Sequence, residues 1–198
     1  MNIARLTLAA LAGCTLCACQ MPTSFARQEV IRRPLLIQPA DSSSSPLYVW
    51  HGLGEPGPVR VTIDLSEQKA YIFRNSENVA WSYVATGRSG HRTPTGSFVI
   101  SEKVVNKRSN KYGSIVDASG DVIRSNATAG VHSAPGGKFQ GAKMPYWMRL
   151  TGDGVGMHAG PIPNPGSPAS HGCIRLPYDM AQRLYDVAPS GTRVTIVP

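Results

Sequence analysis

A thiol and two imidazoles lie close together near the end of the sequence. Cys173 follows His171 in the string Ser-His-Gly-Cys-Ile-Arg, and His158 stands a short way upstream. A thiol reacts as its thiolate, so it needs a neighbour that takes its proton, and an imidazole can do this. The adjacent Gly172 would let a carbonyl group approach backbone N–H donors closely. These residue types predict a cysteine nucleophile for acyl transfer.

Both histidines are candidates for the base. If residues 170–175 are extended, His171 and Cys173 point to the same face two residues apart. Direct proton transfer between such close neighbours is geometrically awkward. His158 ends a separate predicted strand, from which it could reach the thiol across a sheet. Geometry therefore favours His158 as the base and His171 as a supporting group, and leaves the reverse assignment open.

The number of cysteines also sets Cys173 apart. Of the four cysteines, the other three are Cys14, Cys17 and Cys19, all close to the start of the chain. Cys173 is therefore without a partner in the predicted folded part. An unpaired thiol in an oxidising compartment invites oxidation or mispairing, so we interpret it as reactive rather than as a small buried hydrophobe.

The first residues predict export. One basic residue precedes a short apolar stretch, which is typical of a signal segment and too short to span a bilayer. Residues 11–14, Leu-Ala-Gly-Cys, resemble the lipobox of bacterial lipoproteins, and residues 16–19 are a looser match. We expect a lipoprotein-type signal over residues 1–19 and lipid attachment at Cys14 or Cys19. The lipid would hold a periplasmic protein to a membrane.

Composition separates a tether from a folded domain. Residues 20–57 are rich in Ser, Gly and Pro and predict a flexible spacer, with an apolar patch at residues 47–50. Residues 58–198 predict a mostly β domain, and residues 102–145 predict long loops within it. The predicted strands cover residues 59–65, 70–73, 79–86, 97–101, 148–151, 155–158 and 192–197, and one helix covers residues 177–187.

The charge is strongly positive. The net charge is +8 on 198 residues, but the Lys and Arg residues are scattered and no nucleic-acid-binding motif accompanies them. We therefore expect no nucleic-acid partner. A solvated basic surface, or one that meets an anionic polymer, fits this pattern.

The residues around the thiol resemble the signature of the L,D-transpeptidase family, also called the YkuD domain. Residues 170–175 carry the most specific part of the resemblance. His158 resembles the family's upstream histidine, and residues 93–96, Thr-Pro-Thr-Gly, resemble an earlier strand-loop-strand element. The resemblance spans roughly residues 60–197 and implies a YkuD-like β-sandwich with one or two short helices and long loops. One departure is Ala159, because members often have glycine directly after this histidine.

The resemblance implies an enzyme that acts on the stem peptides of peptidoglycan, and so a role in cell-wall organisation and cell shape. Cys173 would attack the carbonyl at the L centre of a diamino-acid residue, D-alanine would leave, and an amine would resolve the thioester. His158 would accept and return protons, and backbone amides around Gly172 and Cys173 would stabilise the oxyanion. The family implies no metal and no organic cofactor, and carbapenem-type inhibitors are expected to acylate the thiol.

The resemblance also assigns the residues around the nucleophile. His171 and Ser170 would order the site, and Arg175 would face the substrate. Tyr146 and Trp147, in an apolar stretch before the upstream histidine, are candidates for lining the substrate groove.

Three other interpretations use the same residues. His132, His158, His171 and Cys173 contain enough nitrogen and sulfur for a zinc site, but none of the usual paired ligand spacings is present. A peptidoglycan-binding lipoprotein without catalysis would have no need of an unpaired thiol beside imidazoles. A carboxypeptidase or endopeptidase would use the same thioester with water as the acceptor, and the sequence around Cys173 does not separate it from a transferase.

Overall fold

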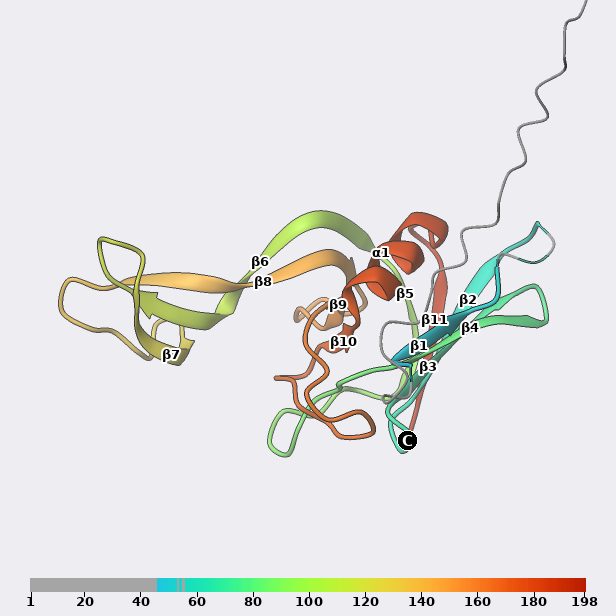
Figure 1. The fold of residues 1–198 in the computed structure, drawn as a ribbon, viewed down its shortest axis with the longest axis horizontal. Coiled ribbons are helices and arrows are strands. Elements are labelled where there is room, and N and C mark those ends of the chain that lie inside the picture. The colour runs from blue at the N-terminus through green and yellow to red at the C-terminus, as the bar shows by residue number, and fades with distance from the viewer. Residues whose placement is uncertain (1–45, 53, 55) are drawn as a thin grey trace, which may run out of the picture. The chain divides into compact units, whose positions relative to one another are not determined.

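The computed structural model describes residues 46–198 except 53 and 55, and strands make up most of its regular structure (Figure 1). Six strands form the first sheet, in the order β1-β4-β3-β2-β11-β5. Neighbours in this sheet are antiparallel except β2 and β11, which are parallel. The bounds are Tyr48–Trp50 for β1, Val59–Asp64 for β2, Lys69–Arg74 for β3, Glu77–Tyr83 for β4, Gly96–Val99 for β5 and Arg193–Val197 for β11.

Alternating apolar and polar residues form this sheet. Val61 and Ile63 of β2 are buried, as are Val194 and Ile196 of β11, while the residues between them are more exposed. A period of two places these apolar side chains on one face, where they meet the core. The strands predicted in this part of the sequence are confirmed, with ends that shift by a few residues.

Five strands form the second sheet, in the order β10-β9-β8-β6-β7. Its bounds are Glu102–Val116 for β6, Val122–Thr128 for β7, Lys138–Arg149 for β8, Gly156–Ala159 for β9 and Ile174–Leu176 for β10. All pairs are antiparallel except β9 and β10, which run parallel. The parallel pair therefore brings together the two segments that carry the predicted chemistry.

The helix predicted near the C-terminus is confirmed as α1, Tyr178–Val187. Pro177 precedes it with a φ of −50°, which suits the start of a helix. Met180, Ala181 and Leu184 are buried on one face and join a core to which both sheets contribute. Two sheets around a shared core, with one helix, confirm the predicted mostly β fold class.

The prediction of long loops over residues 102–145 is wrong, because this region forms β6, β7 and most of β8. We call these three strands the arm; Figure 1 shows β6 and β8 running together to a hairpin-like end beside β7. In β6 and β7 the buried residues are Ile115, Val116 and Ala127. Most of the arm is held together by hydrogen bonds between strand backbones and not by a buried apolar face. Its sequence therefore shows little alternation of apolar and polar residues.

The first sheet begins before the predicted domain boundary at residue 58. Residues 48–50, in the predicted spacer 20–57, form β1 at the edge of the sheet beside β4. The predicted signal over residues 1–19 and the spacer up to residue 45 lie outside the described residues. Among the helices of the described residues, none has the length and apolar character needed to cross a membrane.

Candidate active site

The parallel strands β9 and β10 bring the predicted base and the nucleophile to neighbouring positions. His158 of β9 lies opposite Arg175 of β10, and Cys173 directly precedes β10. Residues opposite one another on adjacent strands project from the same face of the sheet. The intervening apolar residues of both strands enter the core; they are Met157, Ala159, Ile174 and Leu176.

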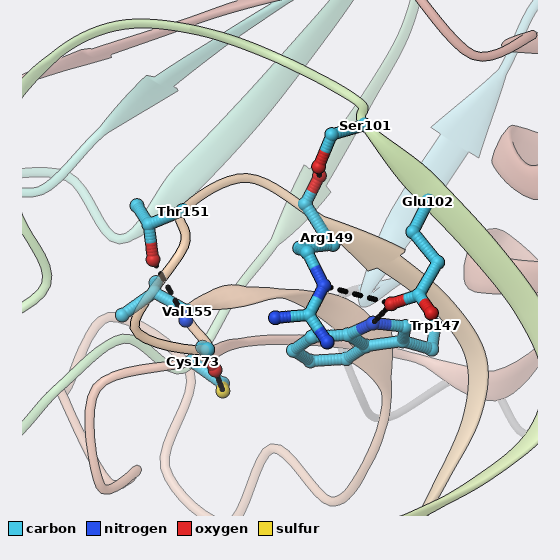
Figure 2. A network of polar contacts seen from close by, with 8 residues as sticks. Ser101, Glu102, Trp147, Arg149, Thr151, Val155 and Cys173 are labelled. Carbon is cyan, nitrogen blue, oxygen red and sulfur yellow. Dashed lines mark hydrogen bonds and ion pairs between the residues drawn. The ribbon is translucent and has the colours of Figure 1, made fainter.

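The thiol of Cys173 is half-buried and rests against the turn between β8 and β9. Its Sγ donates to the Gly154 carbonyl oxygen at 3.7 Å, and Figure 2 shows the sulfur beside this turn. The turn is closed by a hydrogen bond from the Val155 N–H to Thr151 Oγ1 at 2.9 Å. Burial raises the pKa of Cys173, partly opposed by a backbone hydrogen bond with Gly156. The resting thiol is therefore protonated at neutral pH and needs a base before it can attack.

His158 has the protonation state and tautomer of a base. Its ring is buried, with Nδ1 2.8 Å from the Ala159 carbonyl oxygen. A carbonyl only accepts, so Nδ1 carries the hydrogen and Nε2 is left as the proton acceptor. Burial lowers the pKa of His158 to about 4, and the positive charge of Arg175 acts in the same direction. The imidazole is neutral at neutral pH, as a general base must be.

Trp147, predicted to line the substrate groove, is buried near His158. Its ring centroid lies 6.1 Å from that of His158, and the indole is 1% exposed. Glu102 accepts hydrogen bonds from Trp147 Nε1 at 3.3 Å and from Arg149 Nε at 2.7 Å, as Figure 2 shows. The structure packs Gly156 against the same indole, where a Cβ would lie 2.7 Å from the ring. Trp147, Glu102, Arg149 and Gly156 thus form a packed, hydrogen-bonded layer beside His158.

His171 lies between the 87–96 loop and the arm. Arg88 Nη2 is 2.7 Å from His171 Nε2, and the Tyr112 ring stacks on the imidazole with centroids 4.4 Å apart. An arginine only donates, so His171 Nε2 is occupied as an acceptor. Burial and the charge of Arg88 lower the pKa of His171 to about 4. The ring nitrogen that could take a proton from the thiol is already bound to a guanidinium.

Ser170 holds the turn before Cys173 with two hydrogen bonds. Its Oγ accepts a hydrogen bond from the Gly172 N–H at 3.0 Å and donates to the Cys173 carbonyl oxygen at 2.5 Å. Gly172 has a φ of +115°, a conformation that residues with a Cβ rarely adopt. Of the two amides expected to stabilise an oxyanion, that of Gly172 is thus already used by Ser170.

A cleft of about 330 Å³ lies between the arm and the end of β10. Three of its lining residues, Arg108, Lys143 and Arg175, are cationic, and none is acidic. His171 and Tyr112 also line it. The cleft therefore suits an anionic ligand, and His171 and Arg175 on its lining stand two residues before and after Cys173 in the sequence. The sequence did not point to Arg108 and Lys143, because the arm was predicted as loops. The two residues are far apart in the sequence and become neighbours only when β6 pairs with β8.

The two residues predicted to line a substrate groove, Tyr146 and Trp147, lie outside this cleft. Trp147 is buried behind His158, and Tyr146 packs against Tyr178 and Tyr185 with ring centroids 5.3 and 5.7 Å away. Neither lines the cleft. His132, considered above as a metal ligand, accepts a hydrogen bond from the Thr128 N–H on the arm. Within residues 46–198, leaving out 53 and 55, no three His, Cys, Asp or Glu side chains are grouped as metal ligands would be.

Comparison with known proteins decides the family. The family model described as the YkuD L,D-transpeptidase catalytic domain matches residues 58–196. The chain belongs to this family. The resemblance predicted from the residues around Cys173 is thereby confirmed, and the L,D-transpeptidase fold accounts for the two sheets and the single helix.

Individual relatives agree with this family. The YkuD protein of Bacillus licheniformis is 29% identical over 142 residues, which are 71% of this chain and 67% of that protein. An L,D-transpeptidase structure from Mycobacterium smegmatis superimposes with a TM-score of 0.55 at 23% identity, over 71% of this chain and 59% of that one. The structure of LdtMt1 in complex with imipenem has a TM-score of 0.53 at 24% identity, over 70% of this chain and 58% of that one. The chain thus spans just under three fifths of each solved structure.

Alkylation of Cys173 in this L,D-transpeptidase domain is expected to accelerate steadily with pH. The pKa of the thiol is raised and His158 stays neutral above about pH 4, so no thiolate–imidazolium pair forms at rest. The rate should rise about tenfold per pH unit between about pH 5 and pH 8. Iodoacetamide labelling followed by mass spectrometry of the tryptic peptide 150–175 measures this rate separately from the N-terminal cysteines. A plateau at acidic pH would contradict the neutral pair.

Proposed function

We propose that the chain is an L,D-transpeptidase that acts on peptidoglycan stem peptides through a thioester on Cys173. The observation that carries the proposal is the parallel pairing of β9 and β10. The pairing aligns β9, which carries the neutral His158 with Nδ1 on the Ala159 carbonyl, with β10, which begins directly after the protonated Cys173. A thiol directly before one strand and a neutral imidazole on the neighbouring strand are the parts that acyl transfer needs.

The proposed reaction runs in two halves. His158 Nε2 takes the thiol proton while Cys173 Sγ bonds to the carbonyl carbon at the L centre of the diamino-acid residue. The tetrahedral intermediate collapses, the carbon–nitrogen bond breaks, and D-alanine leaves with the proton from His158. An amine then attacks the thioester and gives a proton to His158. The carbon–sulfur bond breaks, and the thiolate recovers that proton.

The cationic cleft supports an anionic peptide as the substrate. Stem peptides carry carboxylates, and Arg175, Arg108 and Lys143 line one cleft, to which His171 of the Cys173 segment also contributes. In the described part of the chain, no carboxylate forms an ion pair with any of these three. Their charges are therefore available to a ligand. LdtMt1 was solved in complex with imipenem, and we expect carbapenems to bind this chain and to acylate Cys173.

Incubation with a purified disaccharide-tetrapeptide tests the proposed function. A transpeptidase releases D-alanine and produces a crosslinked dimer, which mass spectrometry identifies by its mass. A carboxypeptidase releases D-alanine and yields only the tripeptide. That outcome would show that water, and not an amine, is the acceptor. A folded sample that binds the muropeptide and leaves its mass unchanged would contradict catalysis and favour a binding module.

We also propose that the protein is exported and anchored in a membrane by lipid on Cys14 or Cys19. The apolar segment and the lipobox-like residues 11–14 support this proposal. The double substitution Cys14→Ser with Cys19→Ser is expected to move the protein from the membrane fraction to the soluble periplasmic fraction. Cys17→Ser is the matched control and should remain with the membrane. Unchanged fractionation of the double variant would contradict the anchor.

A further inference from the structure

A buried hydroxyl holds the peptide bond that joins Gly172 to Cys173. Thr93 is 6% exposed, and its Oγ1 donates to the Gly172 carbonyl oxygen at 2.8 Å. The Thr93 Oγ1 in turn accepts a hydrogen bond from the Gly87 N–H at 2.9 Å. The single hydrogen of this hydroxyl is therefore committed to Gly172, while Gly87 fixes the hydroxyl from the other side.

The loop that carries Thr93 is itself fixed to the cysteine segment. Gly87 forms a β-bridge with Ser170, and the Thr86 carbonyl oxygen accepts from the Ser170 N–H at 2.9 Å. A Cβ at position 87 would lie 1.8 Å from a carbonyl oxygen of the same loop, so only glycine lets the loop turn back this closely. The buried Gln68 side chain accepts from the Thr86 N–H at 2.9 Å and completes the support. Thr93 thus acts from a rigid position.

The geometry of the peptide bond extends this contact to the nucleophile. A trans peptide is planar, and its C=O and N–H point in opposite directions. Because Thr93 fixes the Gly172 C=O, it also fixes the direction of the Cys173 N–H. Ser170 already uses the Gly172 N–H, whereas none of the described residues accepts a hydrogen bond from the Cys173 N–H. That free donor belongs to the residue whose sulfur would bond to the substrate carbonyl.

We propose that Thr93 is a positioning residue that directs the Cys173 N–H at the oxyanion of the tetrahedral intermediate. This inference rests on the proposed thioester chemistry. Thr93 does not touch the substrate and acts only through the Gly172–Cys173 peptide. When its hydroxyl is removed, that peptide can rotate and the donor loses its direction. The thiol, His158 and their proton transfer remain as they were.

Two reactions of the same sulfur separate this role from a structural one. Acylation by imipenem passes through an oxyanion, whereas alkylation by iodoacetamide does not and needs only the thiolate. In Thr93→Val, the second-order rate of acylation should fall about 10- to 100-fold, since loss of a full oxyanion donor costs about 10²- to 10³-fold. Alkylation should stay within about twofold of the wild-type rate. Thr93→Ser retains the hydroxyl and should acylate within about threefold of the wild type.

Each outcome is decisive. Equal losses in both reactions, or wild-type acylation by Thr93→Val, would overturn the positioning role. If Thr93→Val does not fold, Thr93→Ala replaces it, since alanine adds no atoms. If neither variant folds, the role of Thr93 is to stabilise the fold and the positioning role is overturned. A wild-type chain that imipenem does not acylate at Cys173 would instead overturn the proposed function. The two failures are therefore distinguishable.

Discussion

Cys173→Ser is expected to lower the turnover of a disaccharide-tetrapeptide by at least about 10³-fold, because a serine hydroxyl is far less acidic than a thiol. Burial lowers the pKa of His158 to about 4, so the imidazole is too weak a base to activate that hydroxyl. The release of D-alanine per enzyme per minute measures the effect.

The serine variant exchanges one atom at a half-buried position, so its fold should be retained. Thermal unfolding within a few degrees of the wild type is the control for this. Binding of the tetrapeptide should also persist, because the substitution changes none of the residues that line the cationic cleft. If the folded variant kept a tenth or more of the activity, sulfur would not be the nucleophile.

His158→Gln is expected to reduce the rate of acylation by imipenem by about 10²- to 10⁴-fold, the usual contribution of a general base. The amide of glutamine can donate to the Ala159 carbonyl as Nδ1 does, so the pocket stays filled, but it does not accept a proton at neutral pH. Stopped-flow or quenched-flow measurement of the acylation rate, as a function of imipenem concentration, tests this.

The matched comparison is His171→Gln, which settles the choice of base left open by the sequence. His171 Nε2 is bound to Arg88, so its loss should disturb the order of the site and lower acylation by less than about tenfold. If His171→Gln were the more damaging substitution, the assignment of His158 as the base would be reversed.

The residue types that indicate the chemistry could be predicted from the sequence more completely than the residues that line the cleft. The string at residues 170–175, with the upstream His158 and the 93–96 element, was sufficient to predict the family, which the family model confirms. Their roles in catalysis remain predictions. The strands of the first sheet were also predictable, because each has one face in the core and therefore alternates apolar and polar residues.

The arm and the cleft could not be predicted in the same way. Most residues of β6 and β7 are solvent-accessible. Because these strands pair through their backbones, the sequence need not alternate apolar and polar side chains. Arg108 and Lys143 become neighbours only through the register of β6 and β8. Thr93 looked like part of a loop element, and its contact with Gly172 depends on a hydrogen bond between segments far apart in the sequence.

The most direct test of the proposed function is to locate the acyl group after the wild-type chain has reacted with imipenem. Intact-mass measurement counts the adducts, and tryptic digestion isolates residues 150–175, where Cys173 is the sole cysteine. We predict one imipenem adduct per chain, carried by the Cys173 sulfur. An unmodified Cys173 peptide from folded enzyme that still releases D-alanine from the tetrapeptide would contradict thioester catalysis.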